Sequence, residues 1–414
     1  MKTLFKILAT ALFIISGFTG CKSTDAQSDE IATVDVTKSY PQKELILQDF
    51  LDVEYIPLET SDEFITSAYV QAVSKEIILV RNINQAGAGN IFVFDRKGKG
   101  LKKINRRGQG AEEYMHITGL VALDEDDNEI FVNTSIIRKM MGYDLLGNFK
   151  RSMLYTESKD MLPQSIMIYN PIYSFDRNHL IVQDCVSGRD CYGPKIKDLN
   201  PRNIFLIISK QDGSVIKEIQ IPFEKKVFQG LIAENGGVLG MLSNPGLIPY
   251  RDGWILTEAS ADTIYSYSPD HKLQPLIVRT PSVQDMDPEI FLYPGVITDR
   301  YYFLQTIKKE HDPTELQSNL LTTDLVYDRK EKNAFEYIVY NNDFTTKRAI
   351  ANLVHKQPIL TVINSDEIAF AEQIEAFELV EAYEKGQLKG KLKEIAATLN
   401  EESNSVIMLA KYKK

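Results

Sequence analysis

The residues best suited to binding chemistry are gathered between positions 104 and 116. An arginine side chain can form paired hydrogen bonds with a carboxylate or sulfate group, such as those of acidic glycans. The candidate ligand-binding residues are Arg106, Arg107, Gln109, Glu113, Tyr114 and His116. A structural alternative is also open, in which Arg106 or Glu113 joins neighbouring elements through a buried pair and Tyr114 packs between them.

No other stretch carries the local pattern of a known catalytic or metal site. There is no G-x-S-x-G turn and no phosphate-binding loop, and the five histidines lack the spacing of a zinc site. Asp124–Asn128 has the composition of a calcium loop but lacks the required glycine and trailing glutamate, so we predict a solvated turn. We therefore predict no metal site and no cofactor, with calcium left open. Catalytic residues stay unknown, since carboxylates from separate strands would leave no local pattern.

The composition is that of a soluble globular protein with a large core. Of the 414 residues, 43% are hydrophobic and 25% are charged. The formal net charge is −10 at pH 7. Because nucleic-acid binding depends on a basic surface that contacts phosphates, this charge argues against a nucleic-acid partner.

The first 20 residues have the pattern of a secretory signal peptide. Lys2 and Lys6 provide a basic start, and residues 4–15 are apolar but too few to span a membrane. A small residue directly before Cys21 resembles a bacterial lipoprotein processing site, which predicts a mature chain that begins with a lipidated Cys21. A plain secretory signal with an incidental Cys21 is the alternative.

The sequence predicts three segments. They are a lipoprotein signal peptide over residues 1–20, a flexible polar tether over 21–44 and a folded domain over 45–414. The other two cysteines, Cys185 and Cys191, lie six residues apart in that domain, and in an oxidising compartment they could form a disulfide. Two free thiols are equally open, because spacing in sequence does not show the distance between the Cα atoms.

A unit of strand, polar turn and strand recurs five times along the chain. The equivalent turn positions are residues 98, 147, 213, 271 and 331. A short apolar run precedes each hairpin, in residues 76–80, 129–132, 179–182, 253–257 and 301–304. With one more strand upstream, each unit has four strands, and a period of roughly 50–60 residues is typical of a β-propeller. About 370 residues at about 58 per unit predict six blades.

The ends of the domain are predicted to form the sixth blade together. Residues 53–58 and 406–412 are strand candidates whose pairing would close the ring and cover edge strands. Helical spacing predicts a small helical hairpin over about 370–400. Its apolar faces consist of Phe370, Ile374, Phe377 and Val380 in the first helix and Leu388, Leu392, Ile395 and Leu399 in the second. The predicted fold is all-β, a six-bladed β-propeller of four-stranded antiparallel blades with this hairpin near the C-terminus.

The stretch from residue 104 to 114 also resembles a family pattern. Exported bacterial six-bladed β-propeller lipoproteins, NHL-like in blade layout, carry I-G-R-x-G-Q-G-P-G-E-Y after the first complete hairpin. The matching residues are Ile104, Arg106, Gly108, Gln109, Gly110, Glu113 and Tyr114, whereas Asn105, Ala111 and Glu112 depart from the pattern. Residues 55–60 and 404–408 resemble the opening and closing strands of that family. The resemblance implies the propeller fold, export and a binding or sensing module, but no particular reaction.

In a propeller the innermost strand A of each blade lines the central channel. The connections from strand D to the next strand A, and from B to C, lie on one face, which is usually the binding face. Residues 104–117 would form such a connection. Three long polar loops on this face are candidates for determining ligand specificity, at residues 183–203, 229–251 and 280–300.

We predict a binding or scaffold module anchored to the cell envelope, with a glycan or an envelope protein as partner. The alternative is a hydrolase, lyase or lactonase with carboxylates or a calcium ion on the propeller axis. Three or more inward Asp, Glu, Asn or His side chains that converge at the channel would favour the enzyme. The predicted location is the outer membrane, periplasm or cell surface of a Gram-negative bacterium, with attachment through the lipid anchor and the oligomeric state left open.

Overall fold

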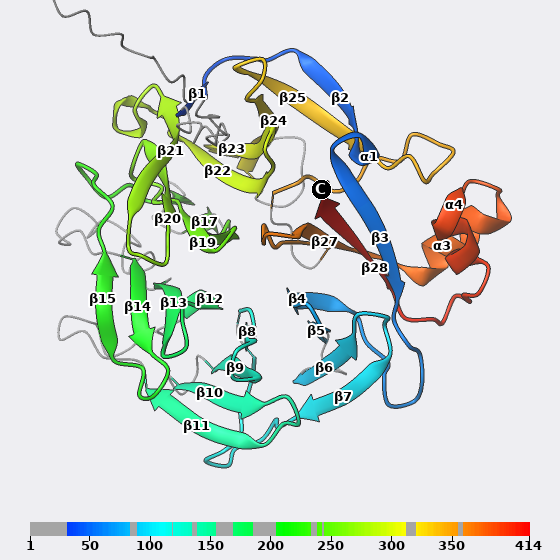
Figure 1. Cartoon of the computed structure of the whole chain (residues 1–414). Helices are drawn as coiled ribbons and strands as arrows, with labels where there is room; N and C mark the ends of the chain where they lie inside the picture. Colours follow the sequence, from blue (N-terminus) through cyan, green and yellow to red (C-terminus); the bar gives the residue numbers. More distant parts are fainter. Residues whose placement is uncertain are drawn as a thin grey trace, which may run out of the picture. The chain divides into compact units, whose positions relative to one another are not determined.

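Six four-stranded antiparallel sheets form a ring, which is the architecture of a β-propeller (Figure 1). The predicted fold class and blade number are therefore confirmed. This computed structural model describes residues 31–82, 89–117, 119–134, 139–154, 169–184, 204–232, 238–241, 244–311, 320–354 and 359–414. The predicted signal peptide, the lipidation site Cys21 and the pair Cys185 and Cys191 lie outside the described residues.

Each blade contains strands A to D, counted from the channel to the rim. Blade 1 consists of β4 (Tyr69–Val73), β5 (Ile77–Arg81), β6 (Asn90–Asp95) and β7 (Gly100–Asn105). Blade 2 consists of β8 (Ala122–Asp124), β9 (Glu129–Thr134), β10 (Lys139–Asp144) and β11 (Phe149–Leu154). Blade 3 consists of β12 (Tyr169–Ser174), β13 (His179–Asp184), β14 (Phe205–Ser209) and β15 (Val215–Ile219).

The second half of the ring follows the same order. Blade 4 consists of β18 (Leu247–Tyr250), β19 (Gly253–Leu256), β20 (Thr263–Tyr267) and β21 (Leu273–Thr280). Blade 5 consists of β22 (Ile290–Ile297), β23 (Tyr301–His311), β24 (Leu320–Asp328) and β25 (Asn333–Tyr340). Blade 6 consists of β26 (Leu360–Val362), β27 (Ile368–Ile374), β28 (Val406–Tyr412) and β3 (Leu51–Pro57). A two-stranded sheet of β16 (Gly230–Ile232) and β17 (Val238–Met241) belongs to the connection between blades 3 and 4.

The second strand of each blade is apolar on both faces because it lies between two neighbouring blades. In β5, Ile78 and Val80 pack with residues of blade 6, whereas Ile77 and Leu79 pack with residues of blade 2. Successive side chains of a strand point to opposite faces, so a strand buried on both faces has a continuous apolar run. This is why the short apolar runs of the sequence correctly marked the second strands.

The turns between strands C and D explain the recurring marker residues. Gly98, Gly147, Gly213 and His271 have φ angles of +84°, +85°, +80° and +64°, as a left-handed turn position requires. In the fifth hairpin the left-handed residue is Lys332, at φ +52°, one position after the predicted Glu331. The three glycine turns also lie close to a neighbouring blade; a Cβ atom built on Gly98, for example, would lie only 2.0 Å from the carbonyl oxygen of Pro57 in β3.

The ring closes through blade 6, as predicted. β3, near the start of the domain, pairs antiparallel with the last strand β28, from Pro57 opposite Val406 to Leu51 opposite Tyr412. The outermost strand of this blade therefore comes from the opposite end of the chain to the other three. This pairing joins the two ends of the domain in one sheet and so closes the ring of blades.

The predicted tether is wrong at its C-terminal end, because residues 31–50 form an ordered N-terminal strap. Within it, β1 (Ala32–Asp35) pairs parallel with β21, and β2 (Gln42–Ile46) pairs parallel with β25. The short helix α1 (Leu47–Phe50) then leads into β3. Val34 and Leu47 are fully buried. The strap thus adds a fifth strand to the rims of blades 4 and 5, where it satisfies backbone groups that an edge strand would leave exposed.

The helical hairpin near the C-terminus is present but shorter than predicted. Its helices are α3 (Ala376–Glu384) and α4 (Gly390–Ala396), and both belong to the connection from β27 to β28. Phe370 and Ile374 lie in β27, and Phe377 is 52% exposed on α3. The helical spacing of these three residues was coincidental, because Phe370 and Ile374 belong to the buried strand β27 and Phe377 belongs to the helix that follows it.

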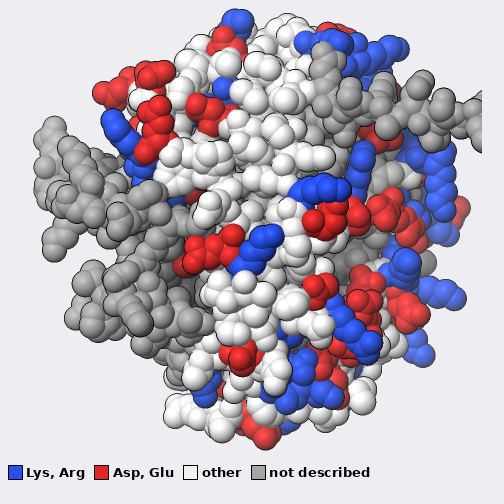
Figure 2. Space-filling view, turned by 60° about the vertical axis from the view of Figure 1, so that its left-hand side comes forward, with Lys and Arg blue, Asp and Glu red and all other residues white. Residues whose placement is uncertain are grey.

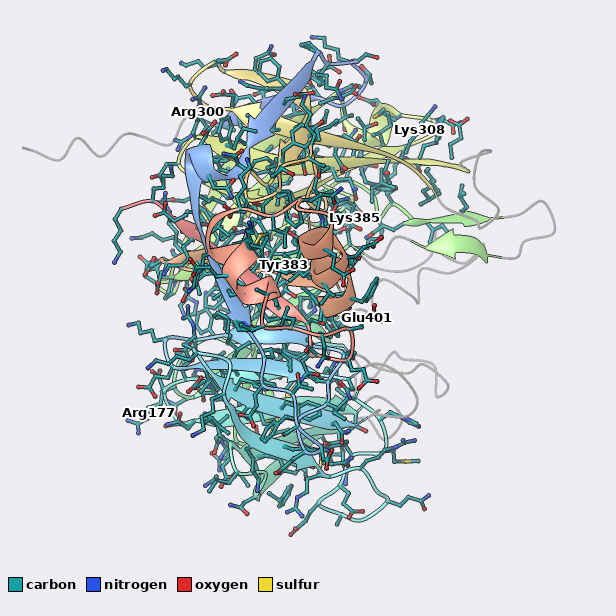
Figure 3. All side chains as sticks on the ribbon, turned by 90° about the vertical axis from the view of Figure 1, so that its right-hand side faces the viewer. Arg177, Arg300, Lys308, Tyr383, Lys385 and Glu401 are labelled. Carbon is teal, nitrogen blue, oxygen red and sulfur yellow. The ribbon has the colours of Figure 1, made fainter. Side chains whose placement is uncertain are left out.

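The connections divide between two faces of the ring. The D-to-A and B-to-C connections form what we call the loop face, and the A-to-B and C-to-D turns form the turn face. In Figure 3, Arg177 and Arg300 from A-to-B turns lie on one side of the ring, and Lys308 near the end of β23 lies on the other.

Part of the predicted loop at residues 280–300 is in fact the strand β22, preceded by the single turn η3 (Val283–Asp285). Lys, Arg, Asp and Glu side chains are interspersed in the view of Figure 2.

Candidate functional site

The motif loop (residues 106–117), which leads from β7 toward β8, contains all six predicted ligand-binding residues. Three of them make internal contacts. The Arg106 Nε donates a hydrogen bond to the carbonyl oxygen of Gly147 at 2.9 Å, which joins blade 1 to blade 2. Tyr114 is fully buried; its hydroxyl donates to the Gly89 carbonyl at 2.6 Å and accepts from the Arg106 amide at 3.0 Å.

Aromatic packing extends this contact between the blades. The rings of Tyr114 and Tyr143 meet edge to face with centroids 5.8 Å apart, and the Tyr143 hydroxyl donates to the Glu112 carbonyl at 2.8 Å. Burial raises the pKa of Tyr114 to about 12, so this hydroxyl keeps its proton. The contacts of Arg106 and Tyr114 therefore match the structural alternative, in which these residues join neighbouring elements and do not bind a ligand. Arg106, however, binds a carbonyl group and not a carboxylate.

The third internal residue, Glu113, explains the glycines of the motif. Its carboxylate accepts a hydrogen bond from the Gly110 amide at 2.8 Å. A Cβ atom built on Gly108 would lie 1.8 Å from the Glu113 Oε2. Gly108 must therefore lack a side chain so that the carboxylate can fold back over its own loop, and no ligand is needed to explain it.

The other three predicted residues are Arg107, Gln109 and His116, and all are exposed. The Arg107 side chain lies over Gly89, where a Cβ atom on the glycine would be 3.1 Å from the Arg107 Cβ. Arg107 therefore lies next to the B-to-C connection of blade 1. The motif loop thus presents one arginine to solvent on the loop face, while its neighbour Arg106 is used between blades.

A second set of polar side chains, which the sequence analysis missed, lies at the inner end of blade 1. Tyr69 is the first residue of β4 and Arg81 is the last residue of β5, and the two are opposite one another in the strand register. β4 begins and β5 ends on the loop face, and β4 is the strand of blade 1 nearest the channel (Figure 1). The Arg81 guanidinium carbon lies 5.1 Å from the centroid of the Tyr69 ring, in a cation–π contact. We call this pair the blade-1 mouth.

The blade-1 mouth holds hydrogen-bond donors without acceptors. Tyr69 is only 2% exposed. Among the residues that the structure describes, neither its hydroxyl nor the Arg81 Nε has a hydrogen-bond partner. Burial raises the pKa of Tyr69, opposed by the nearby Arg81 cation, and burial lowers the pKa of Arg81. An unpaired buried donor costs about 1–3 kcal/mol, so the site is suited to a ligand that supplies acceptors.

Neighbouring blades hold this mouth in place. The Gln71 Oε1 accepts a hydrogen bond from the Val121 amide of blade 2 at 2.9 Å, and the Gln71 Nε2 donates to the Tyr69 carbonyl at 3.2 Å. Tyr173 of blade 3 is close enough that Tyr69 contributes, after burial, to raising the pKa of the Tyr173 hydroxyl. The mouth therefore combines the Arg81 cation with the Tyr69 hydroxyl, next to a hydrogen bond that joins blades 1 and 2.

The acidic segment at residues 124–128 has a structural role. Residues 125–128 form the predicted A-to-B turn. Buried Asp124, at the end of β8, accepts hydrogen bonds from the Lys210 Nζ at 2.5 Å and the Ser174 hydroxyl at 3.3 Å, which joins blades 2 and 3. Within the described ranges, no group of three or more His, Cys, Asp or Glu side chains is placed to hold a metal ion.

Comparison with known proteins places the chain in a family. Residues 31–411 match the model of a domain of unknown function, DUF4934. The chain belongs to the DUF4934 family. The match begins at the strap and ends in β28, so it covers the strap and all six blades of this chain. No curated protein is similar to this chain in sequence.

One solved structure with a TM-score above 0.5 shows the same fold at low sequence identity. A protein of Bacteroides fragilis NCTC 9343, which its name calls exported, is 15% identical with a TM-score of 0.59, covering 93% of this chain and 100% of that one. A DUF4221 member from Bacteroides vulgatus ATCC 8482 is 9% identical with a TM-score of 0.44, covering 88% of this chain and 99% of that one. A streptogramin B lyase is 11% identical with a TM-score of 0.32, covering 71% and 93%. At these identities the first likeness concerns the fold alone, and the lyase likeness is too weak to suggest a reaction.

Proposed function

We propose that this DUF4934 protein is a binding module that recognises an acidic group of a glycan or partner protein at the blade-1 mouth. The observation that carries the proposal is the pair of buried donors, the Tyr69 hydroxyl and the Arg81 Nε, which lack acceptors among the described residues. A carboxylate or sulfate offers only acceptors, and its bond to a guanidinium is charge-assisted. Such a group would satisfy both donors at once.

The motif loop supports the same class of ligand. Arg107 is exposed on the loop face of the same blade, next to Gly89, whereas Arg106 is used internally. Arg107, with exposed Gln109 and His116, would contact a second part of an extended ligand. Because an exposed arginine contributes less than a desolvated one, we expect Arg107 to affect affinity less than Arg81 does.

We propose further that the protein is exported and held at the envelope by acyl chains on Cys21. The apolar segment before Cys21, and the export named for the B. fragilis structural relative, support this. Among the described residues no helix is long and apolar enough to cross a membrane. Labelling of growing cells with an alkynyl fatty acid tests the anchor. We expect the label on the wild type and not on Cys21→Ala, and an unlabelled wild type would contradict lipidation.

Binding to an array of acidic and neutral glycans, and to envelope proteins from the native host, tests the function. We expect acidic ligands to be retained and Arg81→Met to lose most of the binding. Arg177→Met is the matched control, since Arg177 is 78% exposed and lies on the turn face (Figure 3). Equal binding by the wild type and Arg81→Met would contradict the proposal. Cleavage of a bound glycan would instead favour the alternative of a hydrolase or lyase at the channel.

A further inference from the structure

A third free donor lies across from the blade-1 mouth, on blade 2. Thr134 is the last residue of β9, the second strand of that blade, and its side chain is fully buried. Its hydroxyl has no hydrogen-bond partner among the described residues. Because a buried hydroxyl without a partner lowers stability, this group is also suited to a ligand that brings an acceptor.

The direction of the side chains places Thr134 and Arg81 at the same interblade space. Leu79 of β5 and Val132 of β9 belong to one apolar cluster, which fills the space between blades 1 and 2. Side chains two positions apart in a strand point to the same face, so Arg81 lies in the row of Leu79. In the same way, Thr134 lies in the row of Val132. Both residues end their strands on the loop face, and they therefore flank the loop-face end of this space.

Tyr69 adds a donor from the innermost strand of blade 1. Its ring lies against the Arg81 guanidinium, and Gln71 in the same strand accepts a hydrogen bond from the Val121 amide of blade 2 at 2.9 Å. Val121 belongs to the same interblade cluster. The Tyr69 hydroxyl, the Arg81 Nε and the Thr134 hydroxyl thus come from three strands around one space, and all three lack partners among the described residues.

The mouth holds one positive charge. Burial lowers the pKa of Arg81, and in the described part of the chain the neighbour that opposes this shift is Tyr69 and not a carboxylate. Arg81 is partly exposed, so an acidic group could reach it from solvent. A group with a single negative charge would balance the guanidinium, whereas a second negative charge would be desolvated without a counter-charge.

We propose that the acidic group bound at the blade-1 mouth is the sulfate ester of a glycan, with Thr134 as a residue that determines this specificity. The inference rests on the proposed function and narrows its ligand. A sulfate ester has three terminal oxygens and one negative charge, which match three donors and one arginine. A carboxylate has all its acceptor sites in one plane, which suits donors from three strands less well. A phosphate monoester carries about −1.5 to −2 charges at pH 7, which Arg81 alone does not balance.

The motif loop favours a sugar over a sulfated tyrosine of a partner protein. Its exposed residues on the loop face are Arg107, Gln109 and His116, all of which can form hydrogen bonds. Sugar rings carry hydroxyl groups that such side chains can bind, whereas the aromatic ring of a sulfated tyrosine would need an apolar surface.

Binding of matched sulfated and desulfated forms of the same glycans, each form also carrying carboxylates, tests the ligand class. We expect the wild type to bind the sulfated forms about tenfold more tightly, since one more hydrogen bond to a charged group is made. Thr134→Val should lose about this factor for the sulfated form in titration calorimetry at fixed salt, and keep its affinity for the desulfated form. Thr134→Ser keeps the hydroxyl and should retain most of the preference for sulfate.

Thr257→Val is the matched control for Thr134→Val. Thr257 also carries a buried hydroxyl without a partner among the described residues, but it follows the second strand of blade 4. Thr257→Val should therefore bind both glycan forms as the wild type does. Loss of sulfate preference in Thr257→Val as well would show that the loss in Thr134→Val is not specific to the mouth, and would count against the inference.

The outcomes separate this inference from the proposed function. Equal binding of sulfated and desulfated forms by the wild type would overturn the inference even if Thr134→Val did not fold, and so would tighter binding of a sulfotyrosine peptide than of any sulfated glycan. In both cases Arg81→Met could still lose the binding of acidic ligands, and the proposed function would stand. Acidic ligands that bind Arg81→Met as tightly as the wild type would contradict the proposed function itself.

Discussion

Removal of the hydroxyl group should change stability differently at two buried tyrosines on the loop-face side of blade 1, Tyr114 and Tyr69. The Tyr114 hydroxyl makes two hydrogen bonds in the core, to the Gly89 carbonyl at 2.6 Å and from the Arg106 amide at 3.0 Å. The Tyr69 hydroxyl makes none with the described residues, although Tyr69 is also almost fully buried. Tyr114→Phe and Tyr69→Phe therefore make the same chemical change at two buried positions. The first removes a hydroxyl group that is hydrogen-bonded, and the second removes one that has no partner among the described residues.

The expected difference in stability follows from these contacts. Tyr114→Phe leaves a buried carbonyl oxygen and a part-buried amide without the partner they share, which should lower the free energy of unfolding by about 2–3 kcal/mol. Tyr69→Phe removes an unsatisfied donor, so the free energy of unfolding should stay equal or increase slightly. The compact unit from Ile31 to Lys414 has 384 residues (414 − 31 + 1). At about 2.1 cal/mol/K per residue its unfolding entropy is about 0.8 kcal/mol/K, so Tyr114→Phe should lower Tm by about 3 °C.

Urea unfolding followed by tyrosine and tryptophan fluorescence, together with calorimetry, measures both variants against the wild type. The m-value should not change, because neither variant alters the surface exposed on unfolding. Equal losses of stability in the two variants would refute the hydrogen-bond assignment. A large loss in Tyr69→Phe alone would show that its hydroxyl is bonded in the folded protein, and the blade-1 mouth would then lack one of its free donors.

Three further changes test packing and charge elsewhere. Gly98→Ala should destabilise the protein by more than Gly386→Ala in urea unfolding, since both glycines have positive φ but only the Cβ of the first would collide with the neighbouring blade; equal losses would contradict this. Burial raises the pKa of Glu372 to about 7, above its unfolded value near 4.5. Between these two pH values the folded state therefore binds a proton that the unfolded state does not, so Tm should fall as pH rises from about 4.5 to about 7. Glu372→Gln should flatten this fall, and an unchanged pH profile would contradict the assignment. Lys226→Met should cost about 3–5 kcal/mol because it leaves the buried Glu258 carboxylate unpaired, and Lys226→Met with Glu258→Gln should recover most of the loss in the same assay; no recovery would show that the pair is not coupled.

The regular part of the fold could be predicted because local sequence determines it. A tight C-to-D turn needs a residue that tolerates positive φ, which marked Gly98, Gly147 and Gly213. A strand buried on both faces has a mainly apolar run, which marked the second strands of five blades. The closing pair of β3 and β28 could also be predicted, since two leftover strand candidates at opposite ends had to cover one another.

The parts that could not be predicted depend on partners far away in sequence. β1 and β2 lie in a polar segment and become strands only because β21 and β25, more than 200 residues away, offer free edges. Strand β27 was taken for part of an amphipathic helix because its apolar residues Phe370 and Ile374 are four positions apart, which is also the spacing along one face of a helix. The boundaries of α3 therefore could not be derived from spacing alone.

The candidate site was predicted only in part for the same reason. The motif loop was visible because Arg106, Glu113 and Tyr114 lie close together in sequence, and the structural alternative correctly described Arg106 and Tyr114 as contacts between blades, although not the carbonyl group that Arg106 binds. Tyr69 and Arg81 are separated by 12 residues (81 − 69) and come together only through the register of β4 and β5. A charged residue that ends an otherwise apolar second strand was the one available signal for this pair.

The proposed function requires that the blade-1 mouth binds an acidic group through its free donors. Measurement of the affinity of wild type and Tyr69→Phe for one acidic ligand retained on the array, by titration calorimetry at fixed salt, tests it most directly. Because Tyr69→Phe is expected to keep its stability, we expect an affinity about tenfold weaker in a fully folded protein. An unchanged affinity in Tyr69→Phe would contradict the claim and place the ligand elsewhere on the propeller.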